Sequence, residues 1–353
     1  MWFLSSNKVL GLDIGSSSIK IAELEVGRKG AKLLNFGIVP TPGNALNGGD
    51  ITDVNAIASA VRGLYREIGA KRTNVAVGLF GTAVIVKKIT IPRIEGNLVA
   101  DQVRWEAEQY IPFDANAVSL EYHIINPKDT SENMDVLLIA AQNELVTAYQ
   151  NIILQAGLKV GVLDVSAFAL ANLFEFNYGR PDGATVAILN IGSSITNFVV
   201  VDRGEVVFSR DMPIGGQNFT NDIHKEMGVT LVEAESLKLS AAAGGAVPDE
   251  VHTIINTTTE YVCEEVRNSF DFFLGSAGNA ASGLNQVLYS GGGSATPGLI
   301  NNLGRVTKHK FDWFDPFVRI ASGSRKLSSE YLEQIAPYAG ISLGLSLRKA
   351  GES

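Results

Sequence analysis

The sequence holds little cysteine and has no excess of basic residues. Cys263 is the single cysteine among 353 residues, so no internal disulfide can form, and we expect it to be a small buried side chain in a reducing compartment. Lysine and arginine together number 29, against 37 for aspartate and glutamate, which leaves a net charge of −8 at pH 7. Because nucleic-acid binding depends on basic residues that neutralise phosphates, we expect no nucleic-acid partner.

Long apolar runs and metal-binding clusters are also missing from the sequence. No apolar stretch reaches the roughly 18 residues that span a bilayer, and the apolar start, Met1 to Leu4, is too short for a signal-peptide core. The four histidines are scattered without metal-ligand spacing. We therefore expect a cytosolic protein unless a partner tethers it to a membrane, with Trp2 and Phe3 packed on the first sheet or disordered.

What the sequence does contain is an internal duplication. Residues 9–24 and residues 186–201 each combine an apolar, β-rich run, a turn of the form Asp/Asn-Ile-Gly-Ser-Ser and a second apolar run. Each copy continues through a glycine turn into a third run, which is the pattern of a β-hairpin followed by another strand. A long-period duplication of one unit predicts two related lobes that face one another.

The turn of each predicted hairpin has the composition of an anion-binding loop. Backbone N–H groups in a tight glycine-serine turn point inward, and glycine allows close approach to a phosphate. Asp13 lies where a carboxylate can hold hydrated Mg²⁺ beside phosphates, and Lys20 is expected to contact those phosphates. The turn positions that we assign to phosphate binding are Gly15, Ser16, Ser17, Ser18, Gly192, Ser193, Ser194 and Thr196.

Two further groups of residues complete the predicted ligand site. The run Gly291, Gly292, Gly293 and Ser294 follows an apolar strand pattern and precedes a helix, which suits a flat ligand lying against backbone. Glu235 and Lys238 are three residues apart on a helical pattern, so they share a face. In this context we expect them to hold a ribose and the edge of adenine, rather than to form an ordinary surface ion pair.

The remaining segments indicate an α/β protein with an inserted subdomain. Helical periodicity over residues 53–68, 97–110 and 144–156 alternates with strand-like runs, and Trp105 is expected in the core of the insert. A polar tip is expected from Asn126 to Asn133. The predicted domains are residues 1–82 and 158–184 with helix 333–349 for the first lobe, 83–157 for the insert, 185–223 and 284–332 for the core of the second lobe, and 224–283 for its helical subdomain.

These motifs resemble those of the actin-like ATPase superfamily over almost the whole chain. The resemblance implies a two-lobed α/β fold, a duplicated ribonuclease H-like unit, with ATP or ADP and Mg²⁺ bound between the lobes. The segments that carry it are Leu12 to Lys20, Asn190 to Thr196, Ser290 to Ser294 and two helices predicted to link the lobes, which begin near Asp164 and Ile335.

Within that superfamily the chain is similar to the PilM family of type IV pilus assembly proteins, which is related to the cell-division protein FtsA. The similarity rests on Lys88 to Pro92, on Tyr110 to Phe113 and on Pro213-Ile214-Gly215-Gly216, and it adds Gly215 and Gly216 to the expected nucleotide site. It implies a scaffold under the inner membrane that binds the N-terminal cytoplasmic peptide of PilN and other inner-membrane and motor components. The implied peptide groove lies between the first lobe and the insert, near residues 84–91 and 97–110.

Two positions depart from the superfamily pattern in ways that weaken hydrolysis. The second motif begins with Asn190 where aspartate is usual, and an amide carries no charge with which to hold metal-bound water. Ser166 stands where the linking helix commonly has Glu or Gln, and its side chain is too short to orient water. With Asp13 and Asn190 as the catalytic candidates, we expect nucleotide binding with slow or absent hydrolysis, since losing such a group costs on the order of 10²–10⁴ in rate.

Two other functions fit the same fold. A small-molecule or sugar kinase needs a carboxylate base aimed at a substrate hydroxyl, and the sequence offers no aspartate in that context. A filament-forming protein of the FtsA type ends in an amphipathic membrane helix, whereas residues 346–353 are short and polar. Turnover of a sugar, or abundant filaments formed with ATP, would favour these alternatives.

Overall fold

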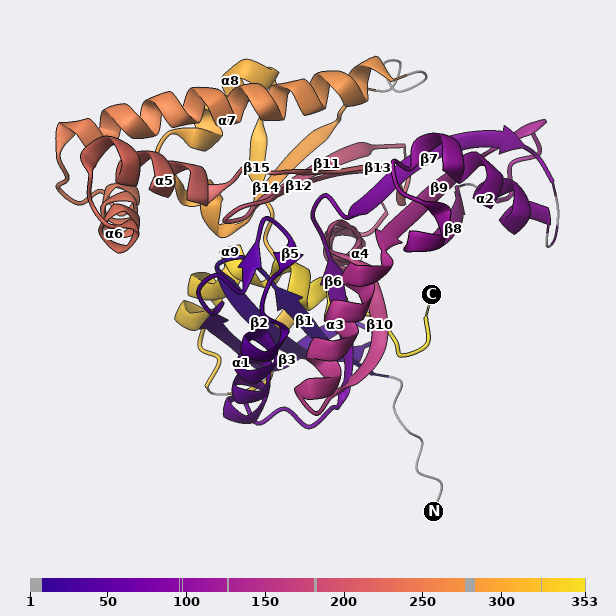
Figure 1. Ribbon diagram of the computed structural model, residues 1–353, viewed down its shortest axis with the longest axis horizontal. Coiled ribbons are helices and arrows are strands. Elements are labelled where there is room, and N and C mark those ends of the chain that lie inside the picture. Colours follow the sequence, from indigo (N-terminus) through magenta and orange to yellow (C-terminus); the bar gives the residue numbers. More distant parts are fainter. Residues whose placement is uncertain are drawn as a thin grey trace.

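The computed structural model describes residues 8–94, 96, 98–125, 127–180, 183–276, 283–324 and 326–352. The expectations for Trp2 and Phe3, for Asn97 as the start of a helix and for Asn126 as the start of a polar tip fall outside these residues. Figure 1 shows two lobes stacked on one another, with an insert that projects from one side. The expected α/β fold of two lobes and an insert is confirmed.

The first lobe is built on a six-stranded sheet with the order β10-β6-β1-β2-β3-β16. Helices α1 and α3 pack on one face of this sheet, and α4 and α9 pack on the other. The elements are β1 (Leu10–Ile14), β2 (Ser18–Gly27), β3 (Gly30–Pro40), the small hairpin β4 (Leu46–Asn47) and β5 (Asp50–Ile51), α1 (Val54–Glu67), β6 (Asn74–Leu79), α3 (Asn143–Gln155), β10 (Lys159–Val165), α4 (Ser166–Tyr178), β16 (Ile320–Ser322) and α9 (Ser329–Ser346).

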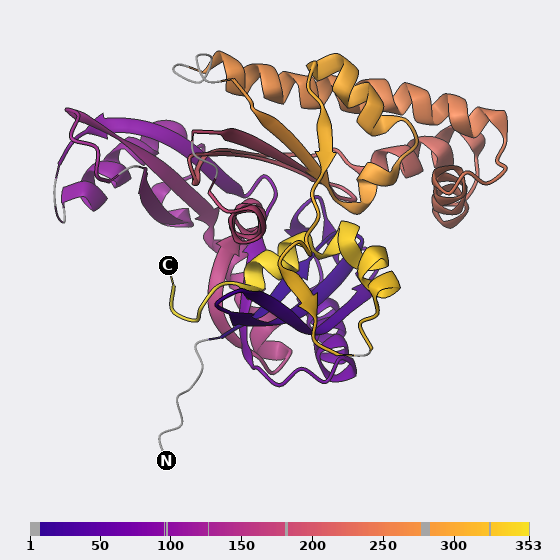
Figure 2. The ribbon, with the colours of Figure 1, turned by 180° about the vertical axis from the view of Figure 1, so that it is seen from behind.

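The second lobe is built on a five-stranded sheet with the order β13-β12-β11-β14-β15. Figure 2 shows the long helix α7 running along the outer side of this lobe, where Phe270 stacks on Phe198 with ring centroids 4.6 Å apart. The elements are β11 (Thr185–Ile191), β12 (Thr196–Asp202), β13 (Glu205–Met212), α5 (Gly216–Met227), α6 (Leu231–Ala242), α7 (Asp249–Gly275), β14 (Gln286–Ser290), the short helix η2 (Gly292–Ala295), α8 (Leu299–Thr307) and β15 (Phe311–Trp313).

The insert is a three-stranded sheet, β7-β9-β8, covered by one helix. Helix α2 buries Val99, Val103 and Ala107 against the sheet, whereas Trp105 is 61% exposed. The expectation that Trp105 lies in the core is therefore wrong, because the three buried positions define the face that α2 turns inward. The elements are β7 (Val84–Pro92), α2 (Leu98–Tyr110), the short helix η1 (Ala115–Ala117), β8 (Val118–Ile125) and β9 (Asn133–Gln142).

The two large sheets repeat one topology, as the duplicated sequence predicts. In the first, β1 pairs antiparallel with β2 and parallel with β6, and β6 pairs parallel with β10. In the second, β11 pairs antiparallel with β12 and parallel with β14, and β14 pairs parallel with β15. The central hairpin of each lobe therefore occupies the same place in its sheet, which brings both hairpin tips to the gap between the lobes.

Two elements belong to a different part of the fold from the one that the predicted domain boundaries assign to them. Helix α3 falls within the range predicted for the insert, yet Tyr149, Ile152 and Ile153 are buried in the core of the first lobe beside α1. Strand β16 falls within the range predicted for the second lobe, yet it pairs with β3 of the first, Ile320 opposite Ala31. The sequence pattern over residues 144–156 predicts the helix but does not say which lobe the helix joins.

The two linking helices cross at a position where only glycine fits. Helix α4 packs between the two sheets, and α9 packs beside it with Ala339 and Leu343 in the same apolar cluster. A Cβ atom on Gly344 of α9 would lie 1.9 Å from the carbonyl oxygen of Ala169 on α4. This close approach joins the two helices that connect the lobes.

We predict that Gly344→Ala destabilises the protein by about 1–3 kcal/mol, because the added methyl group forces the two helices apart. Gly63→Ala is the matched control, since Gly63 lies in α1 with no atom within 4 Å of the added methyl group. That change is expected to stabilise by about 0.4–1 kcal/mol. Chemical denaturation measures both; equal effects of the two substitutions would contradict the close crossing.

Candidate functional site

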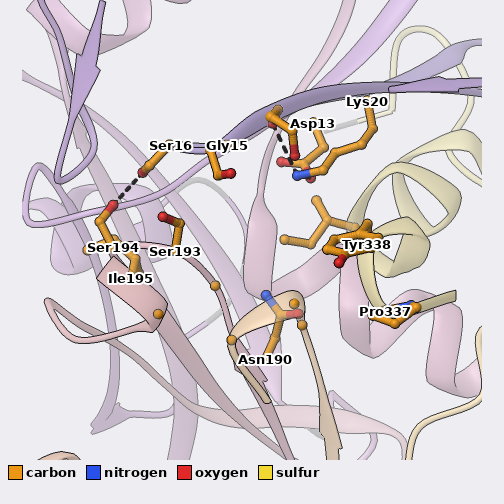
Figure 3. Close-up of a pocket in the computed structure, with 18 of the residues that line it drawn as sticks. Asp13, Gly15, Ser16, Lys20, Asn190, Ser193, Ser194, Ile195, Pro337 and Tyr338 are labelled. Atoms are coloured by element: carbon orange, nitrogen blue, oxygen red, sulfur yellow. Dashed lines mark hydrogen bonds and ion pairs between the residues drawn. The ribbon is translucent and has the colours of Figure 1, made fainter. Parts of the chain in front are cut away.

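The tips of the two hairpins meet across the gap between the lobes. The β1-β2 turn closes where the Gly15 amide donates to the carbonyl oxygen of Ser18 (3.1 Å), and the β11-β12 turn closes where the Gly192 amide donates to Ile195 (3.0 Å). The Ser194 hydroxyl donates a hydrogen bond across the gap to the Ser16 hydroxyl, as Figure 3 shows. Both tips line a cleft of about 540 Å³.

Each hairpin carries a cross-strand pair of polar residues just below its tip. Asp13 lies opposite Lys20, and the two form an ion pair of 3.1 Å. The equivalent pair in the second hairpin is Asn190 opposite Asn197, with the Asn190 amide nitrogen donating to the Asn197 side-chain oxygen at 3.0 Å. All four side chains line the cleft, so the first hairpin presents a charged pair below its tip and the second hairpin presents a pair of neutral amides.

Behind the amide pair, a carboxylate links the second lobe to the root of the insert. Asn197 donates its amide to Asp211 on β13 at 2.7 Å, and the backbone amide of Gly81, just before β7, donates to the other carboxylate oxygen at 2.8 Å. Burial raises the pKa of Asp211, although both hydrogen bonds act to lower it. A chain of side chains therefore runs from Asn190 in the cleft to the segment that leads into the insert.

The start of helix α5 holds the second hairpin in place. The backbone amides of Gly216 and Gln217 donate to the carbonyl oxygens of Gly192 (2.9 Å) and Ser193 (2.7 Å). Any Cβ on Gly215 would lie 2.5 Å from the Ser193 oxygen, so a side chain at this position would displace the tip. These contacts turn two carbonyl groups of the tip toward α5 and away from the cleft.

The glycine run after β14 also packs tightly on the second hairpin. Gly291 has a φ of +92°, and a Cβ at this position would lie 2.2 Å from the carbonyl oxygen of Ile191. At Gly292 an added Cβ would lie 2.5 Å from the ring of Tyr338, which reaches into the cleft from α9 (Figure 3). The loop thus forms a surface of backbone that closes one end of the cleft against an aromatic ring.

Glu235 and Lys238 share one wall of the cleft, as their spacing predicts. The Lys238 ammonium group contacts Glu235 at 2.7 Å and also donates to the Gly216 carbonyl oxygen (3.0 Å) and the Thr220 hydroxyl (2.9 Å). Lys238 is buried, whereas the side chain of Glu235 is 42% exposed. Lys238 therefore fastens α6 to α5, and Glu235 is the member of the pair that is open to a ligand.

The structure brings most of the predicted site residues together. Gly215, Thr196 and Ser294 are the exceptions, because they do not line the cleft; the Thr196 hydroxyl donates to Ile214 (2.8 Å) and the Ser294 hydroxyl donates to Gly291 (2.6 Å). The predicted residues that line it are Asp13, Gly15, Ser16, Ser17, Ser18, Lys20, Asn190, Gly192, Ser193, Ser194, Gly216, Glu235, Lys238, Gly291, Gly292 and Gly293.

Sequence reasoning missed the apolar half of the cleft and the groups behind the second hairpin. Five large apolar side chains that line the cleft come from four separate segments: Ile38, Phe80, Leu239, Tyr338 and Ile341. Nothing in their local pattern marks them, because they converge only after folding. The sequence does contain a pattern that indicates Asn197, because it follows Asn190 by seven residues, just as Lys20 follows Asp13 in the first copy.

The cleft also contains a buried hydroxyl group that has no protein partner. Ser166, at the first turn of α4, is 1% exposed, and its Oγ makes no hydrogen bond to any described residue. A buried polar group without a partner costs roughly 1–3 kcal/mol, so a ligand or a water that binds there is expected to hydrogen-bond to it.

The chain matches the model of the family "Type IV pilus assembly protein PilM" over residues 11–350. It belongs to the PilM family. A solved structure described as the PilM–PilN type IV pilus biogenesis complex superposes with a TM-score of 0.87 at 27% sequence identity, covering 97% of this chain and 98% of the other. The family expectation drawn from the sequence is confirmed.

More distant similarities extend to a cell division protein and to a further solved structure with the same fold. The cell division protein FtsA of Bacillus subtilis (strain 168) is 23% identical over 257 residues, which cover 65% of this chain and 57% of that protein. MreB5 of Spiroplasma citri bound to ADP superposes with a TM-score of 0.50 at 13% identity, covering 93% of this chain and 95% of the other, which shows the fold alone. No helix within the described residues has both the length and the apolar character needed to cross a membrane.

We predict that the pH dependence of stability changes in Asp211→Asn. Because burial raises the pKa of Asp211, the native state holds this proton more tightly than the unfolded state, and the resulting stabilisation is lost as pH rises through the native pKa. The variant has no such loss, so the melting temperature of the wild type relative to that of the variant should fall as pH rises above the ordinary range of an aspartate carboxyl group. Asp50→Asn, on the exposed Asp50, removes the same charge as a control; a constant difference for Asp211→Asn would contradict the assignment.

Proposed function

We propose that this chain is a nucleotide-binding scaffold of type IV pilus assembly, with ATP or ADP in the cleft between its lobes. The observation that carries the proposal is the contact between the Ser16 and Ser194 tips, which sets two glycine-serine turns against one cleft. Such turns direct backbone amides at anions. A cleft of about 540 Å³ is also within the range of small-molecule sites, roughly 300–1,000 Å³.

The two halves of the cleft suit the two ends of a nucleotide. The hairpin tips and Lys20 would face the phosphates, while Glu235 would face the ribose. Apolar side chains such as Leu239, the ring of Tyr338 and the backbone of Gly292 offer a surface for the base. This division follows the chemistry of the lining, since charged groups favour phosphates and flat apolar surfaces favour aromatic rings.

The residues present also fit hydrated Mg²⁺. Asp13 offers one carboxylate at the cleft wall, and Ser166 offers an unpartnered hydroxyl. Mg²⁺ is commonly held by one or two carboxylates together with substrate phosphates and water, and when bound it would offset phosphate charge. The amide of Asn190 is engaged by Asn197 and carries no charge, so we propose that hydrolysis is slow or absent.

We predict that Lys20→Met weakens ATP binding by about tenfold to a hundredfold, because a charge-assisted hydrogen bond to phosphate contributes roughly 1.5–3 kcal/mol. Titration calorimetry in the presence of Mg²⁺ measures the affinity. Lys159→Met, on the exposed Lys159 of β10, removes the same charge at a position that does not line the cleft and should bind as the wild type does. If the two variants bind ATP with equal affinity, Lys20 does not contact the nucleotide. If the wild type does not bind ATP, the nucleotide proposal is wrong.

We further propose that the partner is the N-terminal cytoplasmic peptide of PilN, held in a groove between the first lobe and the insert. The similar structure described as a PilM–PilN complex supports this choice of partner. On the insert, α2 exposes Leu98 (64%) and Trp105 (61%) one above the other, two turns apart. Large apolar side chains left exposed on one face are typical of a protein-binding surface. Other inner-membrane and motor components would then assemble on the same scaffold.

We predict that Trp105→Ala lowers the affinity for a labelled PilN peptide at least about tenfold, as expected for an aromatic anchor. Fluorescence anisotropy measures the binding. Tyr261→Ala is the matched control, because Tyr261 is 53% exposed on α7 of the other lobe and should not contact the peptide. If Trp105→Ala binds the peptide as tightly as the wild type does, the peptide groove does not include α2. If the wild type does not bind the peptide, PilN is not the partner.

A further inference from the structure

The first lobe carries a basic face at the end of β2 that lies away from the cleft. Strand β2 is ten residues long: it starts beside the hairpin tip at Ser18 and ends at Gly27, where the turn to β3 begins. A shallow depression at this end is lined by Lys8, Lys29, Lys32 and Arg319, with Glu25 as its one acidic lining residue. Four positive charges against one negative charge give this face a net charge of +3, in a chain whose net charge is −8.

The side chains of the three lysines on this face have no acidic partner within the described part of the chain. Lys8, Lys29 and Lys32 are exposed, and none of them forms an ion pair with a described residue. Arg28 lies in the adjoining depression, which shares Gly27, Gly30 and Arg319 with the first and is also lined by Arg348, Glu175 and Glu352. Unpaired cations that lie together on one face repel one another, and this repulsion costs free energy. An anionic partner would relieve the repulsion.

Apolar side chains are exposed among these cations. Val26 is 42% exposed and Val318 is 49% exposed, and both line the same depression as Lys29. Lysine is a compact point charge on a flexible stem, suited to mobile headgroups rather than to one fixed carboxylate pair. Basic side chains interspersed with exposed apolar groups are the composition of a surface that rests on an anionic bilayer.

We infer that this basic face, comprising Lys8, Lys29, Lys32, Arg319, Val26 and Val318, docks directly on anionic lipid headgroups. Such docking would place the β2-β3 turn against the bilayer and leave the cleft, at the other end of β2, open to solvent. It does not depend on the proposed nucleotide or peptide, so it can be tested without either.

The test is co-sedimentation of the full chain with vesicles of phosphatidylglycerol and phosphatidylethanolamine, and with vesicles of phosphatidylcholine alone. The wild type should bind the anionic vesicles and should not bind the neutral ones. Binding to the anionic vesicles should weaken as the salt concentration is raised. Lys8→Glu/Lys29→Glu/Lys32→Glu should lose at least about tenfold in apparent affinity, because each basic residue near such a surface contributes roughly fivefold. Lys128→Glu/Lys159→Glu/Lys225→Glu changes the net charge equally at exposed positions elsewhere and should bind as the wild type does.

Three outcomes would overturn the inference: no binding of anionic vesicles by the wild type, equal losses in the two triple variants, or equal binding of neutral vesicles. Tighter binding of polyglutamate than of anionic vesicles would also overturn it and would make the face a site for an acidic protein. Thermal unfolding of both variants checks that they fold, and because the three lysines of the basic face lie outside the cleft, their loss should leave ATP binding unchanged.

Discussion

The contact between two glycine-serine turns, one from each lobe, is the constraint on which the rest of the structure depends. Each turn lies at the tip of a hairpin in the middle of its own sheet, and the two sheets repeat one topology. The Ser16–Ser194 hydrogen bond holds the tips together, so the polar pairs below them face a shared cleft. A ligand that takes the place of this contact would bind both lobes at once.

The packing around the hairpins explains why the cleft has its shape. Glycines at positions 215, 291 and 293 allow backbone to approach the second hairpin more closely than any side chain would permit. Helices α4 and α9 cross at Gly344 and connect the lobes below the cleft. The lobes therefore meet at two places, through these helices and through the tips, and the hydrogen-bonded chain Asn190–Asn197–Asp211–Gly81 connects the cleft to the root of the insert.

The sequence predicts those features that a local pattern encodes. These features include the duplicated hairpins, the glycine run and the spacing of Glu235 and Lys238, whereas the resemblance to the family rests on Lys88 to Pro92, Tyr110 to Phe113 and Pro213 to Gly216. The placement of α3 and β16, the exposure of Trp105 and the apolar lining of the cleft depend on contacts between distant segments, which periodicity does not specify. Asp211 is the clearest case: its strand is evident from the sequence, but its role comes from a hydrogen bond to Gly81, 130 residues away.

The most direct test of the central claim is a crystal structure of the chain with a non-hydrolysable ATP analogue and Mg²⁺. The account predicts that the phosphates lie between the Gly15–Ser18 and Gly192–Ser194 turns, within hydrogen-bond distance of their amides. Density for the analogue at any other place, with the Ser16–Ser194 contact unchanged, would contradict this claim.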